Sequence, residues 1–263
     1  MTTTEDRVLA KPAELCCIKG SIHSGEQKGT IESINGVDTY VSRPSPENAN
    51  NNVILYFPDA FGLYINSFLI MDSLAACGYL VLGVDYFLGD AILKYSKTPL
   101  NDPNFDFQAW KGKHMKSSHE IGERWVKDVK AIYGKDDKTK FACVGYCWGA
   151  QSVCKQLSKD GICKAGAVAH PSFMMESHIY GVEEPIFFSV PNTDTLFSPE
   201  SRSRTIEILT ERNKDFNLQI FSKVTHGFAA RAFLEDPYER WAKEQSFRSF
   251  VDWFDHWLSK ESA

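Results

Sequence analysis

The stretch that most constrains the fold is Phe141–Gln151, which reads FACVGYCWGAQ. A short apolar run rich in β-forming residues ends in Gly145, Cys147 and Gly149 at alternate positions, and the residues after it favour a helix. This order of strand, sharp turn and helix predicts a nucleophile elbow with cysteine in place of the more usual serine. The two glycines are needed because a side chain at either position would collide with the adjoining strand or helix. The helix behind Cys147 would favour negative charge on its sulfur.

The same pattern also fits a simpler structure. A free cysteine behaves mostly as a small apolar residue, so an ordinary turn around a buried Cys147 would give the same letters. The elbow interpretation therefore requires an acid and a base at other strand ends.

Two residues meet that requirement. Asp194 follows an apolar strand expected at Pro185–Val190, and His226 follows one expected at Leu218–Val224. Nucleophile, acid and base thus occur in the chain order of α/β-hydrolase triads. In that scheme His226 takes the thiol proton of Cys147, and Asp194 orients the imidazole and stabilises its charged form.

Each of these residues has a structural alternative. Asp194 could cap the helix that begins near Ser198, and His226 could be a turn residue. His170 also follows a strand and is the best substitute base. No pair of histidines has zinc-site spacing with a third ligand, so we expect neither a metal nor another cofactor.

An oxyanion hole needs two backbone N–H groups near the nucleophile. Trp148, directly after Cys147, is expected to supply one, and Ala60, in the loop after the strand Val53–Phe57, is expected to supply the other. The neighbouring Asp59 could instead accept a hydrogen bond from the thiol and hold it neutral, because a nearby carboxylate disfavours the thiolate.

Composition excludes several classes of protein. The 263 residues carry a net charge of -5 and a pI near 5.8, which argues against nucleic-acid and membrane-surface partners. The N-terminus resembles no signal peptide, and no apolar run is long enough to span a membrane. Seven cysteines, an odd number, fit a reducing compartment, so we expect a cytoplasmic protein. The pair Cys16 and Cys17 lacks the spacing of a metal motif, and packing is the favoured interpretation.

The order of expected elements indicates an α/β fold. Residues 1–13 are expected to be a loose terminus, and residues 14–263 a single α/β-hydrolase domain with a mostly parallel sheet covered by helices on both faces. A hairpin is expected around Asn35-Gly36. Besides the elbow strand before Cys147, strands are expected at 53–57, 79–84, 165–169, 185–190 and 218–224. A helical pattern runs through Phe68, Met71, Leu74 and Ala75 to Gly78, and further helices are expected near 117–133, 199–211 and 237–258. The irregular stretch 86–116 would lie at the carboxyl ends of the strands, as a lid or pocket wall.

These motifs together resemble the dienelactone hydrolase (carboxymethylenebutenolidase) family, over about residues 16–258. The resemblance rests on PDAFG at 58–62, DYFLGD at 85–90, GYCWGA at 145–150, AHPSF at 169–173, NTD at 192–194 and HGFAAR at 226–231. The opening CCIKGSIHSGEQKG, followed by GVDTY, resembles the fungal branch. The resemblance implies a cysteine hydrolase of enol-lactones or related esters. It also implies a triad of Cys147, Asp194 and His226, with Ala60 and Trp148 as the oxyanion hole.

The resemblance further implies that Asp59, Phe87 and Arg231 line the substrate site, with Asp59 where bacterial members carry a glutamate. Those members hold the substrate carboxylate with two arginines. Here Leu88 and Gly89 occupy the region of the first arginine, and Arg231 lies one residue later than expected for the second. Losing one bidentate partner weakens carboxylate recognition, so we expect a physiological substrate other than dienelactone.

Three functions remain open at this point. The first is hydrolysis of small-molecule esters or lactones through an acyl-enzyme on Cys147. The second is a non-catalytic ligand-binding protein of the same fold. The third is redox sensing by Cys147 with Cys143 or Cys154; Cys143 lies too far along an extended strand to pair without rearrangement. The sequence specifies neither the substrate nor the oligomeric state.

Overall fold

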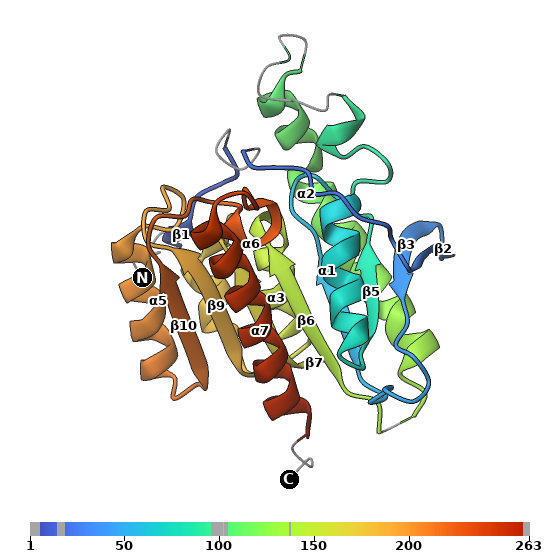
Figure 1. Ribbon diagram of the computed structural model, residues 1–263. Coiled ribbons are helices and arrows are strands. Elements are labelled where there is room, and N and C mark those ends of the chain that lie inside the picture. Colours follow the sequence, from blue (N-terminus) through green and yellow to red (C-terminus); the bar gives the residue numbers. More distant parts are fainter. Residues whose placement is uncertain (1–5, 15–18, 96–101, 103–104, 137, 260–263) are drawn as a thin grey trace.

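The computed structural model describes residues 6–14, 19–95, 102, 105–136 and 138–259. An eight-stranded sheet in the order β10-β9-β7-β6-β4-β5-β3-β2 forms its centre (Figure 1). The strands are β1 (Val8–Ala10), β2 (Thr30–Ile34), β3 (Val37–Ser42), β4 (Val53–Phe57), β5 (Leu80–Val84), β6 (Phe141–Tyr146), β7 (Cys163–Ala169), β8 (Met174–Met175), β9 (Ile186–Pro191) and β10 (Phe216–Phe221). The α-helices are α1 (Ile65–Ala76), α2 (Phe107–Tyr133), α3 (Ala150–Gln156), α4 (Glu176–Tyr180), α5 (Pro199–Glu211), α6 (Phe228–Arg231) and α7 (Pro237–Ser259), with short 3-10 helices η2 (Ile92–Lys94) and η4 (Cys147–Gly149).

The sheet is mostly parallel, as predicted. Strands β5, β4, β6, β7, β9 and β10 run in one direction. At one edge β3 pairs antiparallel with β5, and β2 pairs antiparallel with β3. Every residue of β4 and of β6 is buried, because helices cover both faces of the sheet. The predicted hairpin joins β2 to β3, with Asn35 (φ 48°) and Gly36 (φ 81°) both in the left-handed region that a two-residue turn requires.

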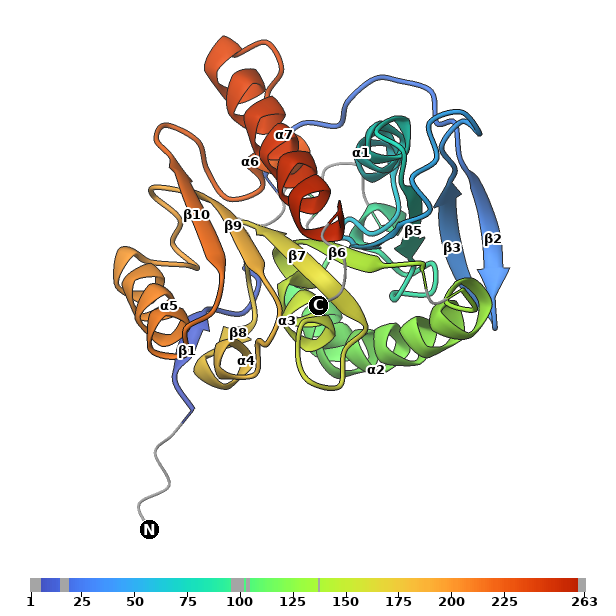
Figure 2. The same ribbon diagram turned by 90° about the horizontal axis from the view of Figure 1, so that it is seen from below.

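Two hydrophobic layers hold the helices to the sheet. Helices α1 and α7 cover one face, whereas α2, α3 and α5 cover the other (Figure 2). On α7, Phe250, Phe254 and Leu258 are buried at four-residue spacing, and the ring centroids of Phe250 and Phe187 are 5.5 Å apart. The aromatic stripe of α7 therefore packs against the sheet.

Three expectations differ from the structure. Helix α2 begins at Phe107, ten residues before its expected start, because the carboxylate of Asp106 accepts a hydrogen bond from the N–H of Ala109 (2.9 Å) and caps it. Part of the terminus expected to be loose is ordered, since β1 pairs with β8. Strand β10 ends at Phe221, three residues before the expected end.

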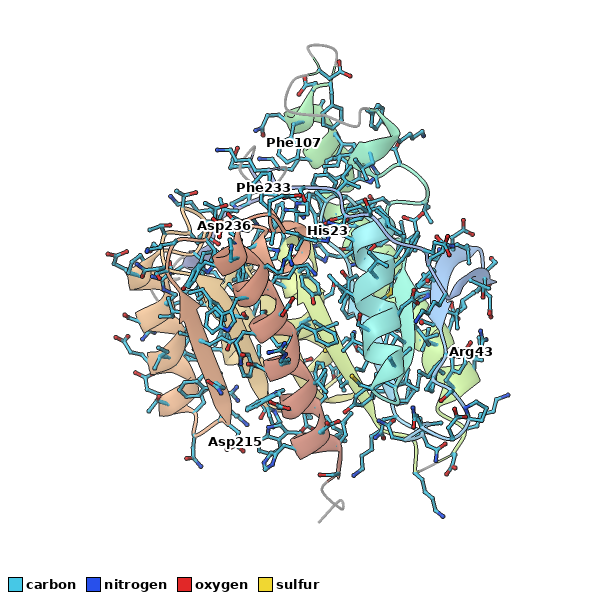
Figure 3. All side chains as sticks on the ribbon, viewed as in Figure 1. His23, Arg43, Phe107, Asp215, Phe233 and Asp236 are labelled. Atoms are coloured by element: carbon cyan, nitrogen blue, oxygen red, sulfur yellow. The ribbon has the colours of Figure 1, made fainter. Side chains whose placement is uncertain are left out.

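The carboxyl ends of the parallel strands lie along one edge of the sheet. Figure 3 shows Phe107 and His23 at this edge, and Asp215, which precedes β10, at the opposite edge. No helix in the described part of the chain is long and apolar enough to cross a membrane. Cys16 and Cys17 lie outside the described residues.

Candidate active site

The backbone around Cys147 has the geometry of an elbow. Cys147 lies directly after β6 with φ at 49°, a strained value for a residue that is not glycine. A Cβ at Gly145 would lie 2.6 Å from the carbonyl oxygen of Gly149, and one at Gly149 would lie 2.3 Å from that of Phe57. Only glycine fits at either position, which is the steric reason that the sequence suggested.

The thiol of Cys147 is fully buried. Its Sγ lies 3.5 Å from Oγ of Ser172, and the N–H of Ser172 donates to the carbonyl oxygen of Cys147 (3.1 Å). Ser172 thus contacts both the side chain and the main chain of Cys147. Ser172 belongs to the AHPSF motif, but its place in the sequence indicates no role for it.

His226 and Asp194 form a hydrogen-bonded pair at the ends of β10 and β9. Nδ1 of His226 lies 2.9 Å from Oδ2 of Asp194, and both side chains are almost completely buried. The other carboxylate oxygen of Asp194 accepts from the N–H of Leu196 (2.9 Å), which fixes its orientation. A carboxylate at Nδ1 keeps the proton there and presents Nε2 for proton transfer.

His170 lies between the elbow and this pair. Its ring centroid is 4.9 Å from that of His226, and it precedes Ser172, the neighbour of Cys147, by two residues. His170 is completely buried, and neither of its ring nitrogens has a hydrogen-bond partner among the described residues. Burial, and then the neighbouring His226, hold the pKa of His170 well below its usual value. His170 is therefore a neutral ring packed against His226.

The residues expected to form the oxyanion hole lie at adjacent strand ends. Ala60 follows β4 and Trp148 follows β6, and these two strands pair in parallel register up to Phe57 and Gly145. The indole N–H of Trp148 donates to Oγ of Ser118 on α2 (2.9 Å). Both Ala60 and Trp148 are fully buried.

An aromatic cluster surrounds the indole of Trp148. Its ring centroid is 5.4 Å from that of Phe87, 5.3 Å from that of Trp110 and 4.7 Å from that of Phe173. Phe87, which the resemblance placed in the substrate site, is buried here. The residue after Cys147 is therefore held by the β5–η2 loop and by α2.

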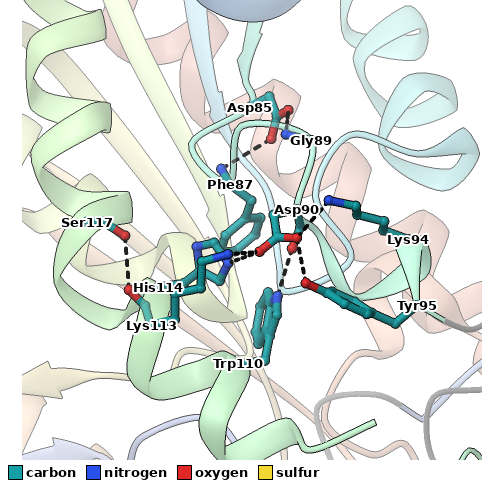
Figure 4. A network of polar contacts seen from close by, with 10 residues as sticks. All are labelled: Asp85, Phe87, Gly89, Asp90, Lys94, Tyr95, Trp110, Lys113, His114 and Ser117. Atoms are coloured by element: carbon teal, nitrogen blue, oxygen red, sulfur yellow. Dashed lines mark hydrogen bonds and ion pairs between the residues drawn. The ribbon is translucent and has the colours of Figure 1, made fainter. Parts of the chain in front are cut away.

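Asp90 joins that loop to α2 (Figure 4). Its carboxylate accepts hydrogen bonds from Lys94 (3.0 Å), Tyr95 (2.6 Å), Lys113 (2.5 Å) and His114 (2.8 Å), and its carbonyl oxygen accepts from the indole N–H of Trp110 (2.7 Å). Burial alone would raise the pKa of Asp90, but hydrogen bonds led by the one from Lys113 outweigh it and hold the pKa well below its usual value. The network fixes the aromatic cluster from behind, and sequence reasoning missed it although Asp90 closes the DYFLGD motif.

Asp59 and Arg231 form a buried ion pair. The other oxygen of Asp59 accepts from the N–H of Phe61 (2.9 Å), and the guanidinium of Arg231 lies 4.5 Å from the ring centre of Phe61. Nε of Arg231 donates to the carbonyl oxygen of Lys19 (3.0 Å). The structure thus joins two residues that the resemblance assigned separately to the substrate site, and the contact of Asp59 with the thiol stays a prediction.

The described residues contain no group of three or more His, Cys, Asp or Glu side chains that could hold a metal ion. At the strand ends, the described residues provide a thiol on a strained backbone, a buried imidazole–carboxylate pair and two backbone loops. These are the parts that acyl transfer through a covalent intermediate requires.

Comparisons with known proteins identify the family of this chain. A family model described as the dienelactone hydrolase family matches residues 37–258. The chain belongs to the dienelactone hydrolase family. It is 61% identical over 261 residues to "Dienlactone hydrolase 1" of Gibberella moniliformis, covering 99% of this chain and 100% of that protein. It is 59% identical to "Dienlactone hydrolase 2" of the same fungus, over 97% of this chain and 100% of that one.

Solved structures show the fold of the family. A protein from Klebsiella pneumoniae, described as a candidate dienelactone hydrolase, matches with a TM-score of 0.69 at 15% identity, over 88% of this chain and 99% of that one. The predicted α/β-hydrolase fold is confirmed, and so is the resemblance to fungal dienelactone hydrolases. This dienelactone hydrolase-like protein is therefore a carboxylic ester hydrolase.

Proposed function

We propose that the protein hydrolyses small-molecule esters or lactones through an acyl-enzyme on Cys147. His226 takes the thiol proton as sulfur attacks the carbonyl carbon, and the N–H groups of Ala60 and Trp148 stabilise the oxyanion. When the tetrahedral intermediate collapses, the C–O bond breaks and His226 protonates the leaving alkoxide. A water molecule then gives a proton to His226 and attacks the thioester, which releases the acid and returns the proton to Cys147.

The observation that carries this proposal is the 2.9 Å contact between His226 and Asp194, combined with the elbow geometry at Cys147. His170 and Ser172 connect the two halves, because His170 packs on His226 and Ser172 contacts the sulfur. A neutral His170 beside His226 adds no charge that would compete with the imidazolium formed during the reaction.

The ion pair supports a substrate without an essential carboxylate. Arg231 faces Asp59, so its charge is already balanced. Leu88 and Gly89 occupy the region where bacterial members carry the other arginine. We therefore expect uncharged esters or lactones to be hydrolysed at least as well as analogues that carry a carboxylate.

Family membership argues against the non-catalytic ligand-binding alternative, but the complete burial of Cys147 must be reconciled with a role as nucleophile. In the hydrolase, the residues that cover the sulfur must move to admit the substrate. In the binding protein, Cys147 would be a packed core thiol. Labelling with iodoacetamide near neutral pH separates the two, because the hydrolase requires selective modification of Cys147 over the buried Cys154.

The direct test is turnover of p-nitrophenyl acetate by the wild type, Cys147→Ala and the control Cys154→Ala. We expect the first variant to lose turnover and the second to retain it. Equal rates for the wild type and Cys147→Ala would exclude the proposal.

Five cysteines among the described residues are free thiols. This supports a reducing compartment, and we propose the cytoplasm. All strands from β2 to β7, with β9 and β10, belong to one sheet. This supports our proposal that residues 14–263 fold as one domain. Co-fractionation of the protein with cytosolic markers would test the compartment. A single cooperative unfolding transition of the purified protein would test the single domain.

A further inference from the structure

A groove lies between β1, α2 and α4, and Cys147, Asp194 and His226 are not among the residues that line it. Its volume is about 590 Å³, within the range of small-molecule sites. Six apolar residues line it: Val8, Ala10, Pro12, Met115, Phe173 and Met175. Val8 and Met115, on opposite walls, are 43% and 47% exposed, which is high for large apolar side chains. The groove therefore offers an apolar surface that the described residues leave uncovered.

The groove continues into a smaller and more polar pocket of about 240 Å³. His119, Glu123, Gln151 and His178 line both spaces, so they form one site with an apolar mouth and a polar inner end. Gln151 lies 3.1 Å from Nε2 of His178, so one polar group of this inner end is already paired.

Two polar atoms at the inner end have no partner among the described residues. Nε2 of His119 and Oε1 of Gln156 are buried and make no hydrogen bond there, although Gln156 is only 6% exposed. Burial of such atoms without a hydrogen bond is costly, so a group that hydrogen-bonds to them offsets that cost. Burial, then the charge of His178, lower the pKa of His119 to about 4, so its imidazole is neutral at pH 7.

The charges around the site balance. Lys116 and Lys155 oppose Glu120 and Glu123, and Lys116 pairs with Glu120 at 3.6 Å. A site without net charge, and with a neutral imidazole and an amide at its inner end, gives no advantage to an ion. With the proton of the neutral His119 imidazole on Nε2, a hydroxyl group suits both atoms, because it accepts from that N–H and donates to Oε1 of Gln156.

We propose that this groove and pocket bind a neutral alcohol or phenol with an apolar body, at a site separate from Cys147. The apolar body lies between Val8 and Met115, and the hydroxyl group reaches His119 and Gln156. Phe173 lines the groove and packs on Trp148 with 4.7 Å between ring centroids, so it forms the wall on the side of the nucleophile.

The test is a ligand-observed NMR titration of the full chain with 1-naphthol. We compare the wild type, Met115→Asp and Ile132→Asp; Ile132 is on the same helix and 48% exposed, but it does not line the site. We expect saturable binding by the wild type and Ile132→Asp, and at least about tenfold weaker binding by Met115→Asp, because a carboxylate is poorly tolerated beside an apolar ligand. We expect 1-methoxynaphthalene, which has no hydroxyl proton to donate, to bind the wild type about three- to tenfold more weakly.

Circular dichroism establishes that each variant is folded. If Met115→Asp does not fold, Val8→Asp on the opposite wall takes its place with the same expected loss. Absence of saturable 1-naphthol binding up to about 1 mM, equal affinities for the wild type and the wall variant, or equal affinities for the two ligands would each overturn the proposal.

Discussion

The buried ion pair between Asp59 and Arg231 gives the sharpest prediction about stability. Both side chains are about 2% exposed, so folding removes both charges from water and pairs them with each other. Replacing Arg231 with methionine leaves the Asp59 carboxylate buried without its counter-charge. Loss of one partner from a buried pair costs about 3–5 kcal/mol, and we expect the free energy of unfolding to fall by that amount.

The measurement is a double-mutant cycle by urea unfolding at pH 7. Asp59→Asn removes the negative charge at nearly constant shape, so the double variant Asp59→Asn/Arg231→Met should lose much less than the sum of the single variants. Arg43 pairs with Glu32 at 2.7 Å, but these side chains are 54% and 40% exposed, which makes the pair the matched control. Arg43→Met should cost less than about 1 kcal/mol. A loss for Arg231→Met as small as the Arg43 loss, or purely additive single losses, would refute the reasoning.

The same pair connects the two loops of the candidate active site. Asp59 precedes Ala60, and a Cβ at Gly227, the residue after His226, would lie 2.5 Å from Nη2 of Arg231. The guanidinium therefore crosses the turn that carries His226. At a temperature where Arg231→Met remains folded, we expect kcat for p-nitrophenyl acetate to fall more than KM rises, because the geometry of the reacting groups is disturbed.

Three further perturbations test other parts of the account. Asp194→Asn should lower kcat by about 10³- to 10⁴-fold in ester turnover assays and leave the unfolding midpoint nearly unchanged, because it disrupts the tautomer of His226 and not the packing; a loss under tenfold would contradict the triad. His170 stays neutral in the folded protein but gains a proton in the unfolded chain, so the wild type should lose stability below about pH 6.5. The limiting slope is about 1.4 kcal/mol per pH unit, and His170→Asn should reduce it in urea titrations from pH 7 to 5. The pKa of Asp90 is lowered in the folded protein, so its carboxylate stabilises the fold above the unfolded pKa of about 4 and loses that effect as pH falls. Asp90→Asn should therefore lower Tm at pH 7 and differ little from the wild type at acid pH. An equal difference in Tm at both pH values would argue against this role.

The local elements could be predicted because their signals are local. The strand Val53–Phe57 and the helix Pro199–Glu211 have the predicted bounds, since a continuous apolar run and an N-terminal Ser-Pro cap mark them. The start of α2 could not be predicted, because its first ten residues are mixed in character and form a helix on the cap of Asp106 and on packing of Trp110 against Trp148. The strand at Val8–Ala10 depends on a partner more than 160 residues away, at Met174 and Met175.

The candidate site likewise has some features that the sequence predicts and others that it does not. Cys147, Asp194 and His226 could be proposed from strand ends, because parallel strands bring their carboxyl ends to one edge. The contact of Ser172 with the sulfur, the packing of His170 on His226 and the pairing of Asp59 with Arg231 depend on how loops fold over that edge. Motif spacing carries no information about such contacts, so only the structure reveals them.

We propose above all that Cys147 forms an acyl-enzyme with the help of His226. The most direct measurement mixes the protein with p-nitrophenyl acetate, quenches it in acid within milliseconds and locates the acetyl group by peptide mass spectrometry. We predict a transient acetyl group on the peptide that contains Cys147, and a strong reduction of its formation in His226→Asn. Turnover with no acetyl group on Cys147 in the wild type, or acetylation at the same rate in His226→Asn, would contradict the account.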